Sequence, residues 1–491
     1  MGQKATGKIA PDLALPLTLT RTRHKPLHRQ LAEQLREAIL RGVLAPGIRL
    51  PSSRALAKEL GISRNIVLAV YEELLIEGYL IGRHGSGTSV SSDLPRLERA
   101  EGATAQERPR WLTQTIPWLD DGESPPSNQP GVIDFRLGAT STALWPEGVW
   151  RKIWREVSKQ PLPGDYQEPV GDLALRTAVA SYVGRARGVA CQAEDVIITT
   201  SAVQALHLIA QATLDSGRSV ALEDPGYPRA RAIFQHRQAR LIPIPVDTDG
   251  LRVEDLPQGA AAPHLVYVTP SHQFPLGVRL SIVRRLALLE WARENESLII
   301  EDDYDSEFRF GAQPLPALAG LDHLSRVAYI GTFAKLLTPS LRLGYVIAPR
   351  PLREYMAQAK ILSDVHPSWL LQQALVHFFK EGYLERYIQR LRYHYAQKRA
   401  TLVEALAPLT NQIQIAGLEA GLHTCLELSA GLREKKVIVR AAKRGIMVYP
   451  LSRHYLGTPD KHALLLGYGG LTDEQIRQGA EQLVAAIQEE W

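Results

Sequence analysis

The first part of the chain has apolar positions spaced as on one face of a helix. In LHRQLAEQLREAILRG, apolar side chains recur every three or four residues from Leu27 to Leu40, and Gly42 follows them. This spacing predicts an amphipathic helix that ends at the glycine. After a Pro-Gly turn, RALAKEL predicts a second helix, which Ser52 or Ser53 can cap.

A third helix is predicted from RNIVLAVYEELLIEG, which Gly61 separates from the second helix and Ser63 caps. Its inward-facing side chains are predicted to be Ile66, Val70, Leu74 and Leu75. The next segment, YLIGRHGSGTSV, predicts two short strands around a Gly-rich tip. Two short helices around a glycine turn, followed by a hairpin, indicate a winged helix-turn-helix, which we place at residues 20–92.

The pattern then changes twice. Residues 93–131 mix Pro, Gly, Ser and charges with little periodicity, which predicts a linker. From residue 132 onward, short apolar runs alternate with amphipathic helices; the predicted strands are VIITT, SVALED, ARLIPIPV, HLVYVTP, SLIIEDDY, RVAYIG and GYVIAP. This alternation predicts an α/β fold with a mostly parallel sheet over residues 132–350, and a helical connection with a small α+β subdomain over residues 351–491.

Composition limits the class of protein. The 491 residues suggest about three structural units, and 45% hydrophobic with 22% charged residues is ordinary for a globular chain. No apolar run is long enough for a membrane span, and the N-terminus lacks the apolar core of a signal peptide. Cys191 and Cys425 cannot form a disulfide framework or a cysteine zinc site. We expect a soluble, cytoplasmic protein.

The net charge of +5 is concentrated near the N-terminus. Residues 1–92 carry 13 Lys and Arg against 7 Asp and Glu, a net charge of +6, so the rest of the chain sums to −1. A local basic excess suggests a polyanion partner, although surface charge also fluctuates by this much. The predicted recognition helix and wing carry a polar, basic set: Arg49, Ser52, Arg54, Ser63, Arg64, Asn65, Arg83 and His84.

These side chains suit DNA, because arginines fit phosphates and Arg64 and Asn65 can reach base edges. For any one of them, solvated surface is an alternative. The segment LPSSRALAKELGISRNIVLAVYEELLIEGYL resembles the GntR-type winged helix of bacterial regulators, over about residues 20–90. The resemblance implies DNA contacts by Arg54, Ser63, Arg64, Asn65, Arg83, His84 and Gly85.

The large domain has a lysine between two predicted strands, Lys335 in GTFAKLLTPSLRLGY. A lysine placed there is costly unless it is used, and it can form a Schiff base with a carbonyl. Thr332 and Arg342 flank it and suit a phosphate, and the Ser201-Ala202-Val203 turn offers helix-start N–H groups to the same phosphate. At the end of IIEDDYD, Asp302 can hold a pyridine nitrogen protonated and Tyr304 can donate to a ring oxygen. Together these residues predict a pocket for pyridoxal 5′-phosphate (PLP).

The segment from about residue 133 to 490 resembles a fold type I aminotransferase domain. DYQEPVGDLALRTAVASYVGRARGVAC, EDPGYP, PSHQFPLG, EDDYDSEFR, GTFAKLLTPSLRLGY and YPLSRHYL stand in the expected order. Behind a GntR-type winged helix, such a domain is similar to the MocR subgroup of GntR regulators. The resemblance makes Lys335 the PLP-linked lysine, Asp302 the pyridine-nitrogen partner and Tyr304 the donor to the ring oxygen. It also implies a stacking Tyr227, phosphate ligands Thr332 and Arg342, and a Tyr166 that reaches the partner subunit's phosphate in a head-to-tail homodimer.

Two arginines are candidates to bind the carboxylate of an effector. Arg453 stands where a GABA-responsive relative has its carboxylate-binding arginine, and Arg229 follows Tyr227 closely; a surface ion pair is the alternative for Arg229. The chain departs from the family at the phosphate turn, which lacks the usual Gly-Ala-Gln. It departs again at HQFPLG, which leaves His272 or Gln273 as substitutes near the ring oxygen.

His423 and His454 fit no metal-ligand spacing and are predicted to be structural histidines, so we expect no metal site. The sequence thus predicts a PLP-dependent, DNA-binding transcriptional regulator that senses an amino compound or PLP itself and is not an enzyme. The main alternative is a working aminotransferase with a DNA-binding extension. A third interpretation is a cofactor-free relic that only dimerises and binds DNA.

Overall fold

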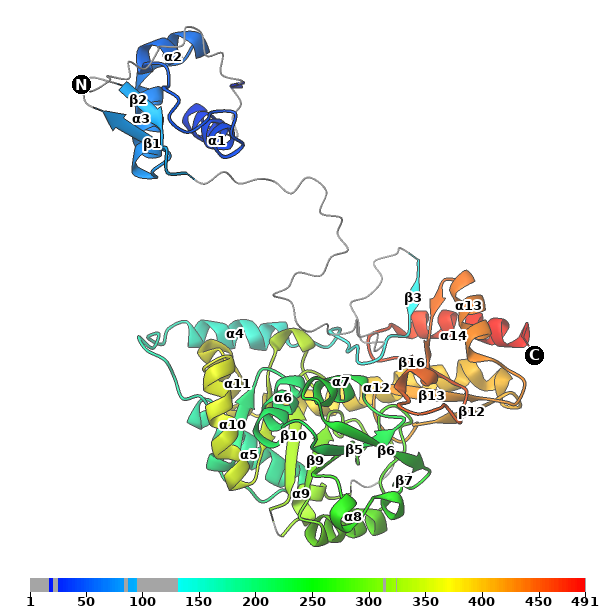
Figure 1. Ribbon diagram of the computed structural model, residues 1–491. Coiled ribbons are helices and arrows are strands. Elements are labelled where there is room, and N and C mark those ends of the chain that lie inside the picture. Colours follow the sequence, from blue (N-terminus) through cyan, green and yellow to red (C-terminus); the bar gives the residue numbers. More distant parts are fainter. Residues whose placement is uncertain are drawn as a thin grey trace. The chain divides into compact units, whose positions relative to one another are not determined.

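The computed structural model describes residues 17–20, 25–83, 87–94, 131–311, 315–323 and 325–490, and of Arg83 it describes only the backbone. These residues form two compact units, one before and one after residues 95–130. Figure 1 labels the helices and strands of each unit. The predicted linker, residues 93–131, lies outside the described residues except at its two ends.

The first unit is the winged helix that the sequence predicts. Its elements are α1 (Leu27–Leu40), α2 (Ser53–Leu60), α3 (Arg64–Ile76), β1 (Leu80–Arg83) and β2 (Gly87–Val90). The strands are antiparallel, with Leu80 opposite Val90. Ser52 caps α2 by accepting a hydrogen bond from the backbone N–H of Ala55 at 3.2 Å, and Gly61 ends the helix at a φ of 63°, a conformation that favours glycine.

Helix α3 differs from its prediction in two ways. Its buried side chains are Val67, Val70, Tyr71 and Leu74. Ile66 and Leu75, predicted to face inward, are only half-buried, because the buried stripe is centred nearer Val67 and Tyr71. Ser63 precedes α3, but its side chain makes no capping hydrogen bond and is exposed, so the prediction that it caps the helix is wrong.

The second unit is built on an eight-stranded sheet with the order β4-β11-β10-β9-β8-β5-β6-β7. The strands are β4 (Val196–Thr199), β5 (Ser219–Asp224), β6 (Arg240–Asp247), β7 (Gly250–Leu251), β8 (Leu265–Val268), β9 (Leu298–Asp303), β10 (Val327–Thr332) and β11 (Gly344–Ile347). Strand β11 is antiparallel to both neighbours and β7 is antiparallel to β6, while the other pairs are parallel. All seven predicted strands are present, and the predicted α/β class is confirmed.

Helices cover both faces of this sheet (Figure 1). They are α4 (Glu147–Val157), α5 (Leu173–Arg187), α6 (Ala202–Thr213), α7 (Pro228–His236), α8 (Ile282–Glu294), α9 (Leu318–Leu321), α10 (Arg350–Ser363), α11 (Trp369–Lys380) and α12 (Tyr383–Leu406). Successive strand residues point to opposite faces. Ile197 therefore packs with α6, α7 and α10, while Ile198 packs with α5, α11 and α12.

The C-terminal part forms a smaller four-stranded antiparallel sheet with the order β12-β13-β16-β15. Its elements are β12 (Ile413–Ala416), β13 (His423–Leu428), α13 (Glu434–Lys443), β14 (Ile446–Met447), β15 (Tyr449–Pro450), β16 (Ala463–Gly467) and α14 (Asp473–Gln488). Strand β3 (Ile133–Asp134) pairs with β14, and Phe135 is buried in this C-terminal core. The start of the second unit thus joins its end. In the described part of the chain, no helix is long and apolar enough to cross a bilayer.

Candidate functional site

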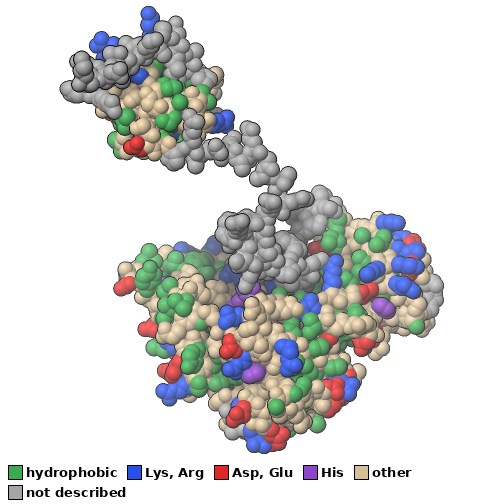
Figure 2. Space-filling model, viewed as in Figure 1, with side chains coloured by type: hydrophobic (Ala, Val, Ile, Leu, Met, Phe, Trp, Pro, Cys, Tyr) green, Lys and Arg blue, Asp and Glu red, His purple; other side chains and the backbone are tan. Residues whose placement is uncertain are grey.

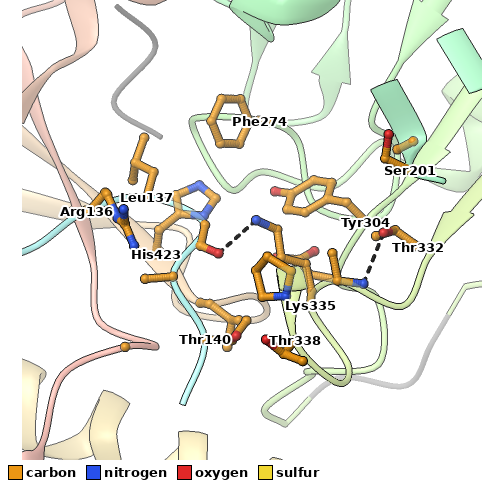
Figure 3. A pocket seen from close by; sticks show the side chains of 18 of the residues that line it. Arg136, Leu137, Thr140, Ser201, Phe274, Tyr304, Thr332, Lys335, Thr338 and His423 are labelled. Atoms are coloured by element: carbon orange, nitrogen blue, oxygen red, sulfur yellow. Dashed lines mark hydrogen bonds between the residues drawn. The ribbon is translucent and has the colours of Figure 1, made fainter. Parts of the chain in front are cut away.

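A cavity of about 650 Å³ lies at the carboxyl ends of β4, β5, β8, β9 and β10, and the C-terminal part lines its other side. This edge of a parallel sheet is where α/β proteins usually bind ligands. Of the ten residues predicted to hold the cofactor, nine line the cavity: Lys335, Asp302, Tyr304, Thr332, Arg342, Tyr227, Ser201, Ala202 and Val203. In Figure 3, Ser201 and Thr332 lie on one side of Lys335, and Arg136 and Leu137 on the other.

Lys335 follows β10 and is half-buried. Its Nζ donates a hydrogen bond of 2.9 Å to the carbonyl oxygen of Gly138, drawn as a dashed line in Figure 3. Gly138 comes from the segment after β3, so a residue near the start of the second unit holds the amine inside the cavity. An amine held at a cavity wall can react with a carbonyl compound that enters there.

Asp302, at the end of β9, is buried and accepts a hydrogen bond of 2.9 Å from the Tyr267 hydroxyl. Burial and the neighbouring Asp302 raise the pKa of Tyr267 well above its ordinary value, so the phenol keeps its proton. A carboxylate oriented in this way suits the N–H of a pyridinium ring. Tyr267 was not among the predicted site residues, and it lies within the buried run LVYV of β8.

The side of the cavity that is predicted to bind a phosphate consists of the start of α6 and the loop after β10. Ser201 caps α6 by accepting a hydrogen bond from the N–H of Gln204 at 3.1 Å. The first-turn N–H groups of such a helix attract an anion. Gly344 makes room for this turn, since a Cβ there would lie 3.3 Å from the nitrogen of Ala202. Arg342 adopts a φ of 51°, rare for a residue other than glycine and typical of functional loops.

Tyr304 is connected to a buried pair. Its hydroxyl lies 2.9 Å from Nδ1 of His272, which also lies 3.0 Å from Oδ2 of Asp305. His272 and Gln273 were predicted as substitutes near the ring oxygen, and among the described residues neither of them lines the cavity. Gln273 instead donates its amide hydrogens to the carbonyls of Pro225 and Phe274, each at 2.8 Å.

Phe274 takes that place in the wall. Its ring packs edge-on against Tyr304 at 6.0 Å and against Tyr227 at 5.4 Å, measured between ring centroids. The same ring contacts His423 and His454. Phe274 therefore adds an apolar ring to the cavity wall beside Tyr227 and Tyr304.

His272, Asp305 and His423 form a group that linear spacing did not reveal. All three are buried, and one possible metal-ligand atom of each lies within 4.8 Å of the others. Each has a hydrogen-bond partner, since His423 Nε2 lies 3.1 Å from the carbonyl oxygen of Pro275 and His272 contacts Asp305. Burial lowers the pKa of His423 well below its ordinary value, so its ring is neutral. We interpret the group as a hydrogen-bonded network.

The predicted effector arginines come from adjacent segments. Arg229, in α7, lines the cavity and is half-buried. Arg453 is exposed in the turn after β15 and is outside the cavity wall that the described residues form. Arg231 of α7 donates to the carbonyl oxygens of Tyr455 and Arg453, at 2.7 and 3.4 Å, so the turn packs against the helix of Arg229. Arg136 also lines the cavity, although it was not among the predicted site residues.

Tyr166, the tenth predicted cofactor residue, does not line the cavity among the described residues of one chain. It is 78% exposed and contacts the ring of His366 edge-on. That Tyr166 reaches the partner subunit's phosphate in a homodimer therefore stays a prediction.

In the winged helix, the predicted DNA-contacting side chains that the structure describes lie on the surface and not in a cavity. Arg54, Ser63, Arg64 and Asn65 are all exposed, at the starts of α2 and α3. Arg64 Nε donates to the hydroxyl oxygen of Ser53 at 3.3 Å, which joins the two helix starts. Figure 2 shows basic side chains on the viewed face of this unit and little acidic surface there. His84 and Gly85 lie outside the described residues, and the Arg83 side chain is also not described.

Both parts of the chain match known families. Residues 27–90 match the family described as bacterial regulatory proteins, gntR family, and residues 139–483 match aminotransferase class I and II. The HTH-type transcriptional regulator YdeL of Bacillus subtilis is 38% identical over 95% of this chain and 98% of its own length. The probable rhizopine catabolism regulatory protein MocR of Rhizobium meliloti is 36% identical over 96% of both chains.

The pyridoxine biosynthesis transcriptional regulator PdxR of Corynebacterium glutamicum is 34% identical over 91% of this chain and 93% of its own. Among solved structures, kynurenine aminotransferase of Pyrococcus horikoshii has a TM-score of 0.69 and 28% identity, and covers 73% of this chain and 91% of its own. The cavity residues fit the cofactor of such enzymes: an amine, a buried carboxylate, a phenol and a helix start surround one space.

Proposed function

Because the chain belongs to the MocR-type group of GntR-family transcriptional regulators, in which a winged helix is joined to a PLP-binding aminotransferase-like domain, we propose that its cavity senses an amino compound or PLP and controls DNA binding. One observation carries this proposal. Nine predicted cofactor residues surround a single cavity in a chain that also carries an exposed basic DNA-binding surface.

In this proposal each predicted cofactor residue in the cavity binds a particular group of PLP. PLP supplies an aldehyde that condenses reversibly with primary amines. Lys335 holds it covalently, Asp302 accepts the pyridine N–H and Tyr304 donates to the ring oxygen. Tyr227 stacks on the ring, and the phosphate is bound by Thr332, Arg342 and the Ser201-Ala202-Val203 turn.

We assign the effector carboxylate to Arg229 and Arg453. Arg229 already lines the cavity, and the turn that carries Arg453 is attached to α7 through Arg231. A guanidinium binds a carboxylate through two parallel hydrogen bonds, which selects amino acids over simple amines. An effector with an amino group for PLP and a carboxylate for these arginines fits both ends of the site.

The second partner is double-stranded DNA. We assign its contacts to Arg54, Ser63, Arg64 and Asn65 and to the wing residues Arg83, His84 and Gly85. A head-to-tail homodimer of the aminotransferase-like domains, with Tyr166 reaching the partner subunit's phosphate site, would present two winged helices to repeated half-sites. An effector changes DNA affinity only if it binds two conformations of this dimer differently.

The test separates a sensor from an enzyme. Full-length protein is loaded with PLP and mixed with a panel of amino acids and 2-oxo acids, while the visible absorption and the products are followed. We expect a spectral change with some amino acids and no sustained product formation. Repeated turnover would instead support an aminotransferase with a DNA-binding extension. A band that is absent, or unchanged in Lys335→Ala, would support a cofactor-free relic.

A further inference from the structure

The contacts of His272 determine which of its nitrogens carries the proton. Nδ1 lies 3.0 Å from Oδ2 of Asp305 and 2.9 Å from the hydroxyl of Tyr304. A nitrogen lone pair accepts one hydrogen, whereas a ring N–H can be shared between two acceptors, and a carboxylate can only accept. Both contacts are therefore satisfied together when Nδ1 carries the proton.

The other ring nitrogen supports the same tautomer. Nε2 of His272 is buried and has no hydrogen-bond partner among the described residues. A buried N–H without an acceptor is costly, so an unprotonated Nε2 is favoured. His272 and Asp305 are 1% and 2% exposed, so water does not replace these contacts.

Two glycines hold the imidazole in this orientation. Gly277 and Gly421 have φ values of 74° and 80°, in the region that favours glycine. A Cβ on Gly421 would lie 2.1 Å from Cε1 of His272, and one on Gly277 would lie 3.0 Å from Nε2. The ring thus fills a slot between two backbone segments, and its Nδ1 edge cannot turn away from Tyr304 without moving them.

The protonation of Nδ1 determines where the Tyr304 hydroxyl can donate its hydrogen. When its oxygen accepts the Nδ1–H, its own hydrogen is donated to an acceptor other than the imidazole. We propose that Asp305 and His272 are a positioning pair that directs the Tyr304 hydroxyl hydrogen toward the ring oxygen of PLP held by Lys335. This inference rests on the proposed placement of PLP, and it assigns a role to Asp305, which lines the cavity, and to His272, which does not line it among the described residues.

The pair should affect how bound PLP responds to pH. A hydrogen bond donated to the ring oxygen favours its negatively charged form, which makes the Lys335-linked nitrogen lose its proton at a lower pH. Other charged or titratable groups around the phenol are Asp302 at the end of β9, Lys335 after β10, Tyr227 before α7 and His423 in β13. These groups are the same in every variant whose pH midpoint is compared below, so differences between those midpoints report on the pair and on Tyr304.

The experiment uses full-length PLP-loaded protein and measures the pH midpoint of the visible absorption change. Tyr304→Phe and His272→Leu should each raise the midpoint by about one pH unit, because each removes the oriented donor. His272→Asn, whose amide nitrogen can take the place of Nδ1–H, should stay near the wild type. Asp305→Asn, whose amide can donate to Nδ1 and reverse the tautomer, should shift the midpoint upward.

A double variant completes the test. In the Tyr304→Phe background, His272→Leu should add no further shift, because the pair acts only through the phenol. An unchanged midpoint in Asp305→Asn, or a His272→Leu shift that adds to the Tyr304→Phe shift in the double variant, would overturn the positioning role. If His272→Leu does not fold, the midpoint of Asp305→Asn still decides. A wild-type band that persists in Lys335→Ala would overturn the placement of PLP itself, and this inference with it.

Discussion

The two candidate sites of this chain use polar side chains in opposite environments. In the winged helix, Arg54, Arg64 and Asn65 are exposed. In the cavity, Asp302 and Thr332 are buried, and Asp302 is tied to Tyr267 by a hydrogen bond. An exposed arginine is available to any phosphate, whereas a buried carboxylate serves only a ligand of matching shape.

This difference predicts how each site fails. Exposed charges contribute through their number, and salt screens them. Buried groups contribute through their individual geometry, because each has been removed from water and depends on its partners. A single substitution among the exposed DNA-contacting residues should therefore weaken DNA binding only in part. A single substitution among the buried cavity residues should abolish ligand binding.

The largest expected effect is in the cavity. Lys335→Ala should abolish covalent PLP binding and the visible band entirely, because no other amine is assigned to this wall. DNA binding in the absence of ligand should remain, since Lys335 is not part of the winged helix. Absorption spectra and a gel-shift assay check both halves, and loss of DNA binding in correctly folded Lys335→Ala would contradict the separation of the two sites.

Salt should act on the DNA surface and not on the cavity. If two winged helices neutralise about eight phosphates, log affinity should fall with log salt at a slope of about −7, roughly 10⁴-fold between 50 and 200 mM. The intensity of the PLP band should change little over the same range, because its ligands are buried or face the cavity. A slope near zero would contradict the assignment of the basic unit to DNA.

A single arginine should give a smaller, graded effect. Arg64→Ala should weaken operator binding by about 1–3 kcal/mol, or roughly 5- to 150-fold, and leave the PLP spectrum unchanged. Arg41→Ala is the matched control, because Arg41 lies at the end of α1 and pairs with Glu37. Equal losses from both variants would indicate general charge and not a contact of the recognition helix.

The smallest expected effect comes from a buried acid next to the cavity. Glu223 accepts hydrogen bonds from Thr269, and burial raises its pKa to about 7. A raised pKa means that ionisation destabilises the fold, so this cost develops as pH rises from about 4.5 to 7 and is complete above 7. The free energy of unfolding of Glu223→Gln should therefore exceed that of the wild type by more at pH 8 than at pH 5. We expect this excess to grow by an amount on the order of 1–2 kcal/mol between the two pH values. Thermal unfolding at both pH values measures this gain, and an equal difference at both values would contradict it.

The sequence was informative where function or fold leaves a local pattern. Runs rich in Val and Ile predicted the seven strands, and a lysine between two such runs led to Lys335. The helix start after Ser52 also followed from local capping rules, and the Ser52 side chain caps α2. A helix start at the Ser201-Ala202-Val203 turn was predicted as well, and α6 begins at Ala202. Such features depend on neighbours within a few residues.

The missed features depend on contacts between distant segments. Tyr267 reaches Asp302 because parallel pairing sets Tyr267 of β8 opposite Ile300 of β9, and Asp302 follows two residues later on the same face. Phe274 enters the cavity wall, while Gln273 turns inward to hold the carbonyl of Pro225. No local sequence pattern predicts that, of His272, Gln273 and Phe274, the last would face the cavity.

The central claim is that the cavity controls the DNA surface. The most direct test titrates a promoter fragment with repeated half-sites against full-length protein, alone, with PLP, and with PLP plus an amino acid. We predict that one of these ligand states changes the wild-type affinity by about fivefold or more, and that Lys335→Ala removes the change while keeping the salt dependence. Equal affinities in all ligand states, or an identical response in Lys335→Ala, would contradict the claim.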